Sequence, residues 1–173
     1  MAGIAPPHPV SYLLLENLAF LAVSTLFLAT VGYLWRGLKP FSLPEPLPSW
    51  FALWFGSVQF LGGVVPAIAL IWGIWQGSAP VLLALIPYLV VLVLQVLTES
   101  IAIRQAKSVV WVMVPYLYVP YRIWQLWEGW LWLDGAASTW LGWLLAFEAV
   151  VWLANYLLDL AQLPRLLQWP QDP

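Results

Sequence analysis

The chain has 173 residues, of which 63% are hydrophobic and only 8% are charged. A soluble domain normally carries about a quarter charged residues, so this composition indicates that lipid is the outer solvent. A net charge of −2 and the lack of a basic run argue against a nucleic-acid partner. With no cysteine and one histidine, His8, the sequence excludes disulfides, thiolate metal sites and bis-histidine haem ligation.

Hydropathy predicts one all-α membrane domain over residues 1–173, a polytopic bundle of five transmembrane helices. The expected spans are residues 11–35, 50–75, 79–101, 108–133 and 138–162. Each is close to the ~20 residues that cross the hydrocarbon core. The first span is expected to stay in the mature protein, because no Lys or Arg precedes it and it is longer than a signal core.

Basic residues predict how these spans are oriented. Arg36 with Lys39, Arg104 with Lys107, and Arg165 fall in three regions that five spans place on one side of the membrane. By the positive-inside rule, the C-terminus is expected to be cytoplasmic or stromal and the N-terminus outside or lumenal. The expected location is a prokaryotic plasma membrane or a thylakoid membrane.

The sixth basic residue, Arg122, falls inside the fourth span, where a charge is costly. At 1.5 Å per residue it lies about 16 Å from the Asp134 end of that span, and Glu148 lies about 15 Å into the fifth. An ion pair between Arg122 and Glu148 near the midplane is therefore expected. It would either fix the register of the two helices or form part of a polar pocket. Glu16 and Glu128 are alternative partners nearer the outer surface.

The fourth span holds two closely spaced prolines, Pro115 and Pro120, which predict a kinked or locally unwound helix. On this span Tyr118, Arg122 and Gln125 share one stripe, which is the candidate cavity wall, whereas Tyr116 and Tyr121 point in different directions. Pro66 and Pro87 are expected to bend the second and third spans, and Gln59 is a further polar group at mid-depth. Ordinary kinks without a ligand are the alternative.

Tryptophan is unusually abundant, with 14 copies that cluster toward the ends of the spans. An aromatic belt at headgroup level explains most of them. Trp124 and Trp127 fall at the depth of the buried charges, so we test them as walls of a site for a flat ligand. Glu99 is interpreted as part of a solvated loop, and Asn155 with Asp159 as capping and interhelical hydrogen bonding.

The five-span, tryptophan-rich design with a proline-rich first connection resembles the translocator protein (tryptophan-rich sensory protein) family. The residues behind the resemblance are Trp35, Leu38, Lys39, Pro40, Pro46, Pro48 and Trp50. It implies a membrane protein that binds porphyrins or sterols. The spacing departs from the family's pattern, and the Pro-Tyr element of that family belongs to its last span, whereas Pro115-Tyr116 lies in the fourth span here. The composition also resembles that of small cyanobacterial thylakoid proteins.

No catalytic signature is present, because the chain lacks clustered metal ligands and a nucleophile with a base, so an enzyme is not expected. We expect instead a protein that binds a flat hydrophobic ligand or helps a membrane complex to assemble. A non-covalent tetrapyrrole, a carotenoid or a lipid would be the ligand. The alternatives are an accessory subunit of a larger, photosynthetic membrane complex and a small channel or carrier. The expected partners are the lipid bilayer and either another membrane protein or a second copy of the chain.

Overall fold

A computed structural model describes residues 9–37, 49–105, 107–133 and 140–166, and all regular structure within these ranges is helical. The all-α prediction is therefore confirmed. The elements in chain order are α1 (Pro9–Leu34), α2 (Phe51–Gln59), η1 (Phe60–Val64), α3 (Val65–Trp75), α4 (Ala79–Ser100), η2 (Ile101–Gln105), η3 (Val109–Met113), α5 (Val114–Leu131) and α6 (Trp140–Leu166). The helical segments overlap the five ranges that hydropathy predicts, although η2 continues past the third range and α6 continues past the fifth.

Four of these stretches are long and apolar enough to cross a membrane: Val10–Leu34, Phe51–Trp75, Ala79–Arg104 and Trp140–Pro164. The chain is thus compatible with an integral membrane protein. α5 is not among the four, because it carries Arg122 and Glu128 and has a lower mean hydropathy than the others. The polar residues of α5, among them Arg122, Gln125 and Glu128, are buried against neighbouring helices.

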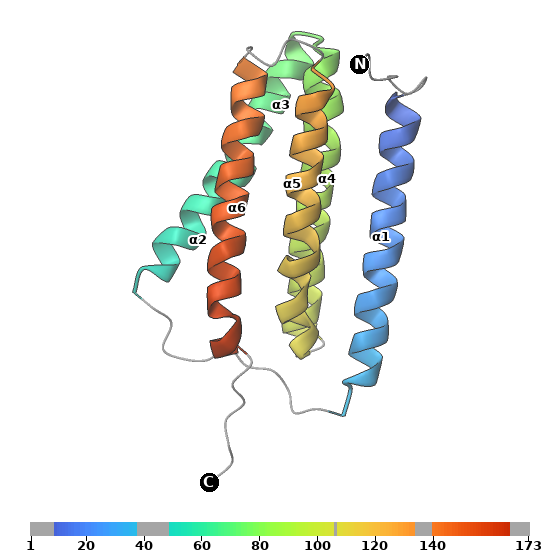
Figure 1. Ribbon diagram of the computed structural model, residues 1–173, viewed down its shortest axis with the longest axis vertical. Coiled ribbons are helices and arrows are strands. Elements are labelled where there is room, and N and C mark those ends of the chain that lie inside the picture. Colours follow the sequence, from blue (N-terminus) through green and yellow to red (C-terminus); the bar gives the residue numbers. More distant parts are fainter. Residues whose placement is uncertain (1–8, 38–48, 106, 134–139, 167–173) are drawn as a thin grey trace.

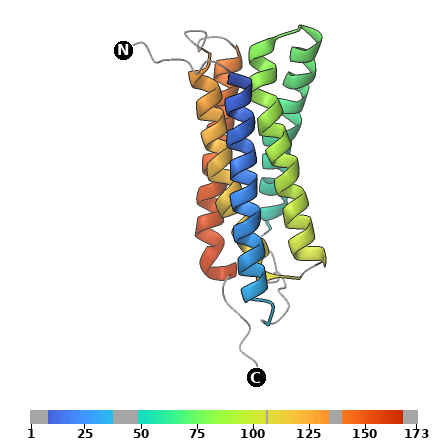
Figure 2. The same ribbon diagram turned by 90° about the vertical axis from the view of Figure 1, so that its right-hand side faces the viewer.

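The helices run side by side along a common axis (Figures 1 and 2). α5 packs against both α4 and α6, and α3 packs against α4. α1 stands at one side and contacts α4 and η3, whereas α2 leans away from the bundle and touches α6 (Figure 1). The C-terminal ends of α1, α4 and α6 lie at the same end of the bundle (Figure 1). Arg36 follows α1 and Arg104 follows α4, so these two exposed arginines lie at that end.

A tight turn joins α3 to α4 at the opposite end. Gly77 has a φ of 64°, a left-handed conformation that favours glycine. The Ser78 amide donates to the Gly73 carbonyl oxygen at 2.9 Å and closes the helix end. Gly73 also allows Val81 to approach its backbone closely. The turn therefore fixes α3 and α4 as antiparallel neighbours.

The second helical stretch changes its winding at η1, a π-helical turn that precedes Pro66. In a regular α-helix the carbonyl of Gly62 would accept a hydrogen bond from residue 66, but proline has no N–H to donate. A π turn is a known way to absorb this mismatch within a helix. The predicted bend at Pro66 therefore takes the form of an inserted π turn whose Gly62 carbonyl needs another donor.

The predicted kink of the fourth helix needs correction. Pro115 lies in the first turn of α5, directly after the 3-10 segment η3, and the α-helix continues through Pro120. A proline in a first helical turn breaks no hydrogen bond, because the amides there have no intrahelical acceptor. The irregular winding thus precedes Pro115 instead of lying between the two prolines.

Candidate functional site

A buried polar layer crosses the centre of the bundle. Arg122 on α5 and Glu148 on α6 are each 0% exposed, and Gln95 and Tyr88 on α4 are buried beside them. Burying a charge is costly unless other groups compensate for the lost water. The surroundings of Arg122 therefore determine whether this layer is stable.

The expected ion pair between Arg122 and Glu148 is not formed. Arg122 Nη2 instead donates to Gln95 Oε1, and its Cζ lies 3.9 Å from the centre of the Trp152 ring. Trp152 is one turn after Glu148 on the same face of α6, so its indole covers the guanidinium. Arg122 Nε and Nη1 and Glu148 Oε1 are buried without a hydrogen-bond partner among the described residues.

The Tyr88 hydroxyl links three elements next to this stack. It donates to the Gly62 carbonyl oxygen, the acceptor that Pro66 leaves without its helical donor. It also accepts from Trp152 Nε1 at 2.7 Å, and it lies 3.4 Å from Glu148 Oε2. Tyr88 thus joins the π turn of the second stretch to α6.

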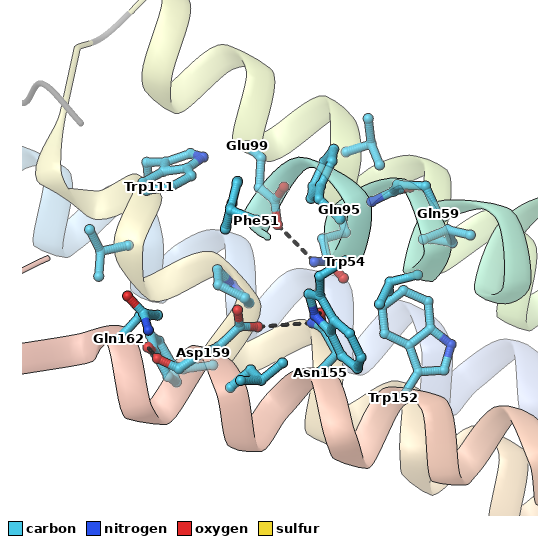
Figure 3. A pocket seen from close by; sticks show the side chains of 18 of the residues that line it. Phe51, Trp54, Gln59, Gln95, Glu99, Trp111, Trp152, Asn155, Asp159 and Gln162 are labelled. Atoms are coloured by element: carbon cyan, nitrogen blue, oxygen red, sulfur yellow. Dashed lines mark hydrogen bonds between the residues drawn. The ribbon is translucent and has the colours of Figure 1, made fainter. Parts of the chain in front are cut away.

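A cavity of about 140 Å³ opens beside this layer, between α2, α4, α6 and the start of α5 (Figure 3). Its wall is mainly aromatic, with polar groups concentrated on α4 and α6. The aromatic lining residues are Trp50, Phe51, Trp54, Phe55, Trp111, Tyr116 and Trp152. The polar lining residues are Gln59, Gln95, Glu99, Asn155, Asp159 and Gln162.

Two amide–carboxylate pairs stand on the cavity wall. Gln95 Nε2 donates to Glu99 Oε1 at 2.7 Å on α4, and Asn155 Nδ2 donates to Asp159 Oδ2 at 3.0 Å on α6 (Figure 3). Each pair has a spacing of four residues, which puts both members on one helix face. The two carboxylates are therefore held in place by neutral groups.

Aromatic donors fix the α6 pair further. Trp54 Nε1 donates to Asn155 Oδ1 at 3.3 Å, and the Tyr116 hydroxyl donates to the Asp159 carbonyl oxygen at 2.6 Å. Because Trp54 is on α2 and Tyr116 is on α5, these bonds tie three elements around the cavity. Its polar wall is thus pre-organised.

A smaller cavity of about 90 Å³ lies toward the other end of the bundle, and its wall includes Asn17, Gln125 and Glu128. Gln125 Nε2 donates to Asn17 Oδ1 at 2.6 Å, whereas Gln125 Oε1 is buried without a partner. Glu16 accepts from Trp124 Nε1 at 2.6 Å. Neither Glu16 nor Glu128 makes an ion pair with Arg122, because Glu128 lines this second cavity and Glu16 binds the indole of Trp124.

The predicted stripe on α5 is buried, but it does not form the cavity wall as a unit. Arg122 and Tyr118 line neither cavity, Gln125 lines the smaller one, and Tyr118 packs edge-on against Phe20 at 5.2 Å between ring centres. Tyr116 and Tyr121 do diverge. Tyr116 reaches α6, whereas Tyr121 stacks on Phe20 of α1 at 3.7 Å between ring centres.

The two tryptophans singled out from the sequence lie on the outer surface of the bundle. Trp124 and Trp127 are 49% and 50% exposed and line neither cavity. The reason is that α5 turns its Arg122 face toward α4 and α6, which leaves these two indoles on the outer surface. Gln59 does line the larger cavity, as does Tyr116.

Sequence reasoning missed most of the larger cavity. Glu99 is half-buried on its wall and is not part of a solvated loop, and Asn155 and Asp159 face the same space. A usable signal was present in the repeated spacing of an amide and a carboxylate four residues apart on two different spans. Gln95, a lone polar group in a long apolar run, was a second signal.

No group of three or more His, Cys, Asp or Glu side chains could hold a metal ion in the ranges that the structure describes. Comparison of the chain with protein-family models, with curated proteins and with solved structures finds no match.

Proposed function

We propose that the chain is a non-enzymatic integral membrane protein that binds a small ligand in the aromatic cavity between α2, α4, α5 and α6. The observation that carries the proposal is the cavity wall, which combines seven aromatic side chains with fixed polar groups. Ligand sites typically combine apolar and aromatic walls with a few well-placed polar groups.

The proposal includes a five-span topology in which α5 also crosses the bilayer. η3 and α5 follow one another without a break from Val109 to Leu131, and α5 packs against two of the four apolar helices. A helix with buried polar groups can cross a membrane if other helices cover those groups. The basic residues near the ends of α1 and α4 then assign that end to the cytoplasm or stroma.

The size of the cavity narrows the ligand. A volume of about 140 Å³ is close to that of an engineered protein cavity of about 150 Å³ that holds benzene. This volume accommodates a single ring, a compact head group or one end of a lipid. It favours these ligands over a whole tetrapyrrole or carotenoid.

The test is purification from the native membrane in mild detergent, followed by an ultraviolet–visible spectrum and mass spectrometry of an organic extract. The proposal predicts a stoichiometric small molecule in the extract. Protein that carries no small molecule but brings down defined membrane partners would favour an accessory subunit instead.

A carrier is the second candidate, because the two cavities lie on either side of Arg122. The larger cavity reaches Gln95, which binds Arg122, and the smaller one reaches Gln125, one turn along α5. A ligand that entered one cavity would need this layer to open in order to reach the other. Flux of the ligand into liposomes would favour the carrier, and binding without flux would favour the binding protein.

A further inference from the structure

We infer that the larger cavity selects a small organic cation, with a quaternary ammonium or protonated amine head group. This inference rests on the proposed function and adds the charge of the ligand to it. It depends on three features of the cavity: unpaired carboxylates, aromatic faces and a negative surrounding charge.

The first feature is a pair of carboxylates that have no cationic partner among the described residues. Glu99 and Asp159 lie on different helices and face the same cavity (Figure 3). Each has one oxygen held by a neutral amide, and no Lys or Arg of the described residues forms an ion pair with either. Like charges in a partly buried space disfavour each other, and a cation placed between them removes that repulsion.

The aromatic walls supply the second feature. Phe51 and Trp54 lie next to the two carboxylates (Figure 3), and Tyr116 lines the same cavity with its hydroxyl on the Asp159 carbonyl oxygen. The electron-rich face of an aromatic ring attracts a cation, and cages of such rings are a common way to recognise quaternary ammonium groups. The same kind of interaction occurs inside the bundle, where Arg122 stacks on the indole of Trp152 at 3.9 Å.

Arg122 does not neutralise the cavity. Gln95 lies between Arg122 and Glu99. Its side-chain oxygen accepts from Arg122, and its amide nitrogen donates to Glu99. Two carboxyl groups, those of Glu99 and Glu148, lie near this guanidinium, and Asp159 lines the cavity with Glu99. Carboxyl groups thus outnumber the guanidinium here, and in their ionised form they attract a cation and repel an anion such as a phosphate head group.

The test compares two probes of the same shape that differ in charge. The first is choline, and the second is its uncharged carbon isostere, in which a tert-butyl group replaces the trimethylammonium group. Both are titrated calorimetrically into the full chain in a neutral maltoside detergent. The inference predicts that choline binds with one-to-one stoichiometry and at least about tenfold more tightly than the isostere.

Isosteric variants identify the site. Glu99→Gln and Asp159→Asn should each weaken choline binding by roughly tenfold and leave binding of the uncharged probe unchanged. Glu128→Gln is the matched control, because it removes a carboxylate of the other cavity and should leave choline binding intact. Thermal unfolding of each variant verifies that the protein is folded.

Equal binding of the two probes would overturn the charge inference and leave the proposed function standing. Binding of neither probe to folded protein would also overturn the cation site, whereas the extraction experiment decides the proposed function separately. Choline binding that survives both Glu99→Gln and Asp159→Asn would place the cation elsewhere and contradict the inference.

Discussion

Arg122 lies over the indole of Trp152, with its Cζ 3.9 Å from the ring centre, and the nearest acidic residue on α6, Glu148, does not pair with it. A planar guanidinium stacks on an aromatic face and donates from its edge at the same time. Here the edge donates to Gln95. The stack and this hydrogen bond compensate for part of the burial of the charge, and Arg122 Nε and Nη1 keep no hydrogen-bond partner among the described residues.

Replacing Arg122 should therefore destabilise the bundle more than replacing any exposed arginine. We expect Arg122→Ala to cost about 3 kcal/mol, because it removes the stack and the bond to Gln95 and leaves Glu148 buried without a nearby cation. The loss of stability in Arg122→Lys should be intermediate, since lysine retains the charge but not the planar group. The measurement is thermal unfolding in detergent, with exposed Arg36→Ala as the control. An Arg122→Ala protein as stable as Arg36→Ala would contradict the account.

Two glycines of the second helical stretch should respond to alanine in opposite directions. A Cβ on Gly62 would collide with the Trp152 indole, whereas a Cβ on Gly56 meets nothing within 4 Å. Gly62→Ala should cost about 1–3 kcal/mol through overpacking. Gly56→Ala should stabilise by about 0.4–1 kcal/mol, because it restricts the unfolded chain. Chemical denaturation measures both, and equal effects would show that Trp152 does not pack on the π turn.

The Tyr88 hydroxyl should be coupled energetically to Pro66. Tyr88→Phe removes the donor to the Gly62 carbonyl and should cost about 1–3 kcal/mol. In a Pro66→Ala background residue 66 regains an N–H that can satisfy the same carbonyl, so the cost of Tyr88→Phe should fall. A double-mutant cycle measures the coupling. Strict additivity of the two changes would rule out the shared acceptor.

The proposed topology can be read from single cysteines, because the natural chain has none. With five spans, Ser78→Cys and Asp134→Cys should react with a membrane-impermeant maleimide on intact cells. Lys107→Cys should react only after the cells are opened. If Lys107→Cys and Asp134→Cys label from the same side, α5 does not cross the membrane.

Much of the fold could be predicted because it follows from local composition. The apolar runs fix where helices occur, and Arg122 stands out because a charge in such a run is costly. The partner of Arg122 could not be predicted, since depth counting places Glu148 correctly along α6 but does not show that Trp152 faces the guanidinium. Which α6 side chain faces the guanidinium depends on the rotation of α6 about its own axis, and packing determines that rotation.

The cavity was beyond prediction for a related reason. It lies between α2 and the rest of the bundle below the π turn, where the direction of α2 depends on how Gly62, Pro66 and Trp152 pack (Figure 1). The sequence suggests a bend at Pro66 but not its direction. The same uncertainty explains Trp124, whose depth was predicted correctly although its direction was not.

Native mass spectrometry of protein purified in mild detergent from its native membrane tests the central claim most directly. Val96 and Val93 are both exposed residues of α4, but only Val96 lines the cavity. The account predicts one small molecule bound to the wild type and to Val93→Trp, and its loss from Val96→Trp, whose indole fills the cavity. The same bound molecule in all three proteins, or none in the wild type, would contradict a binding site in this cavity.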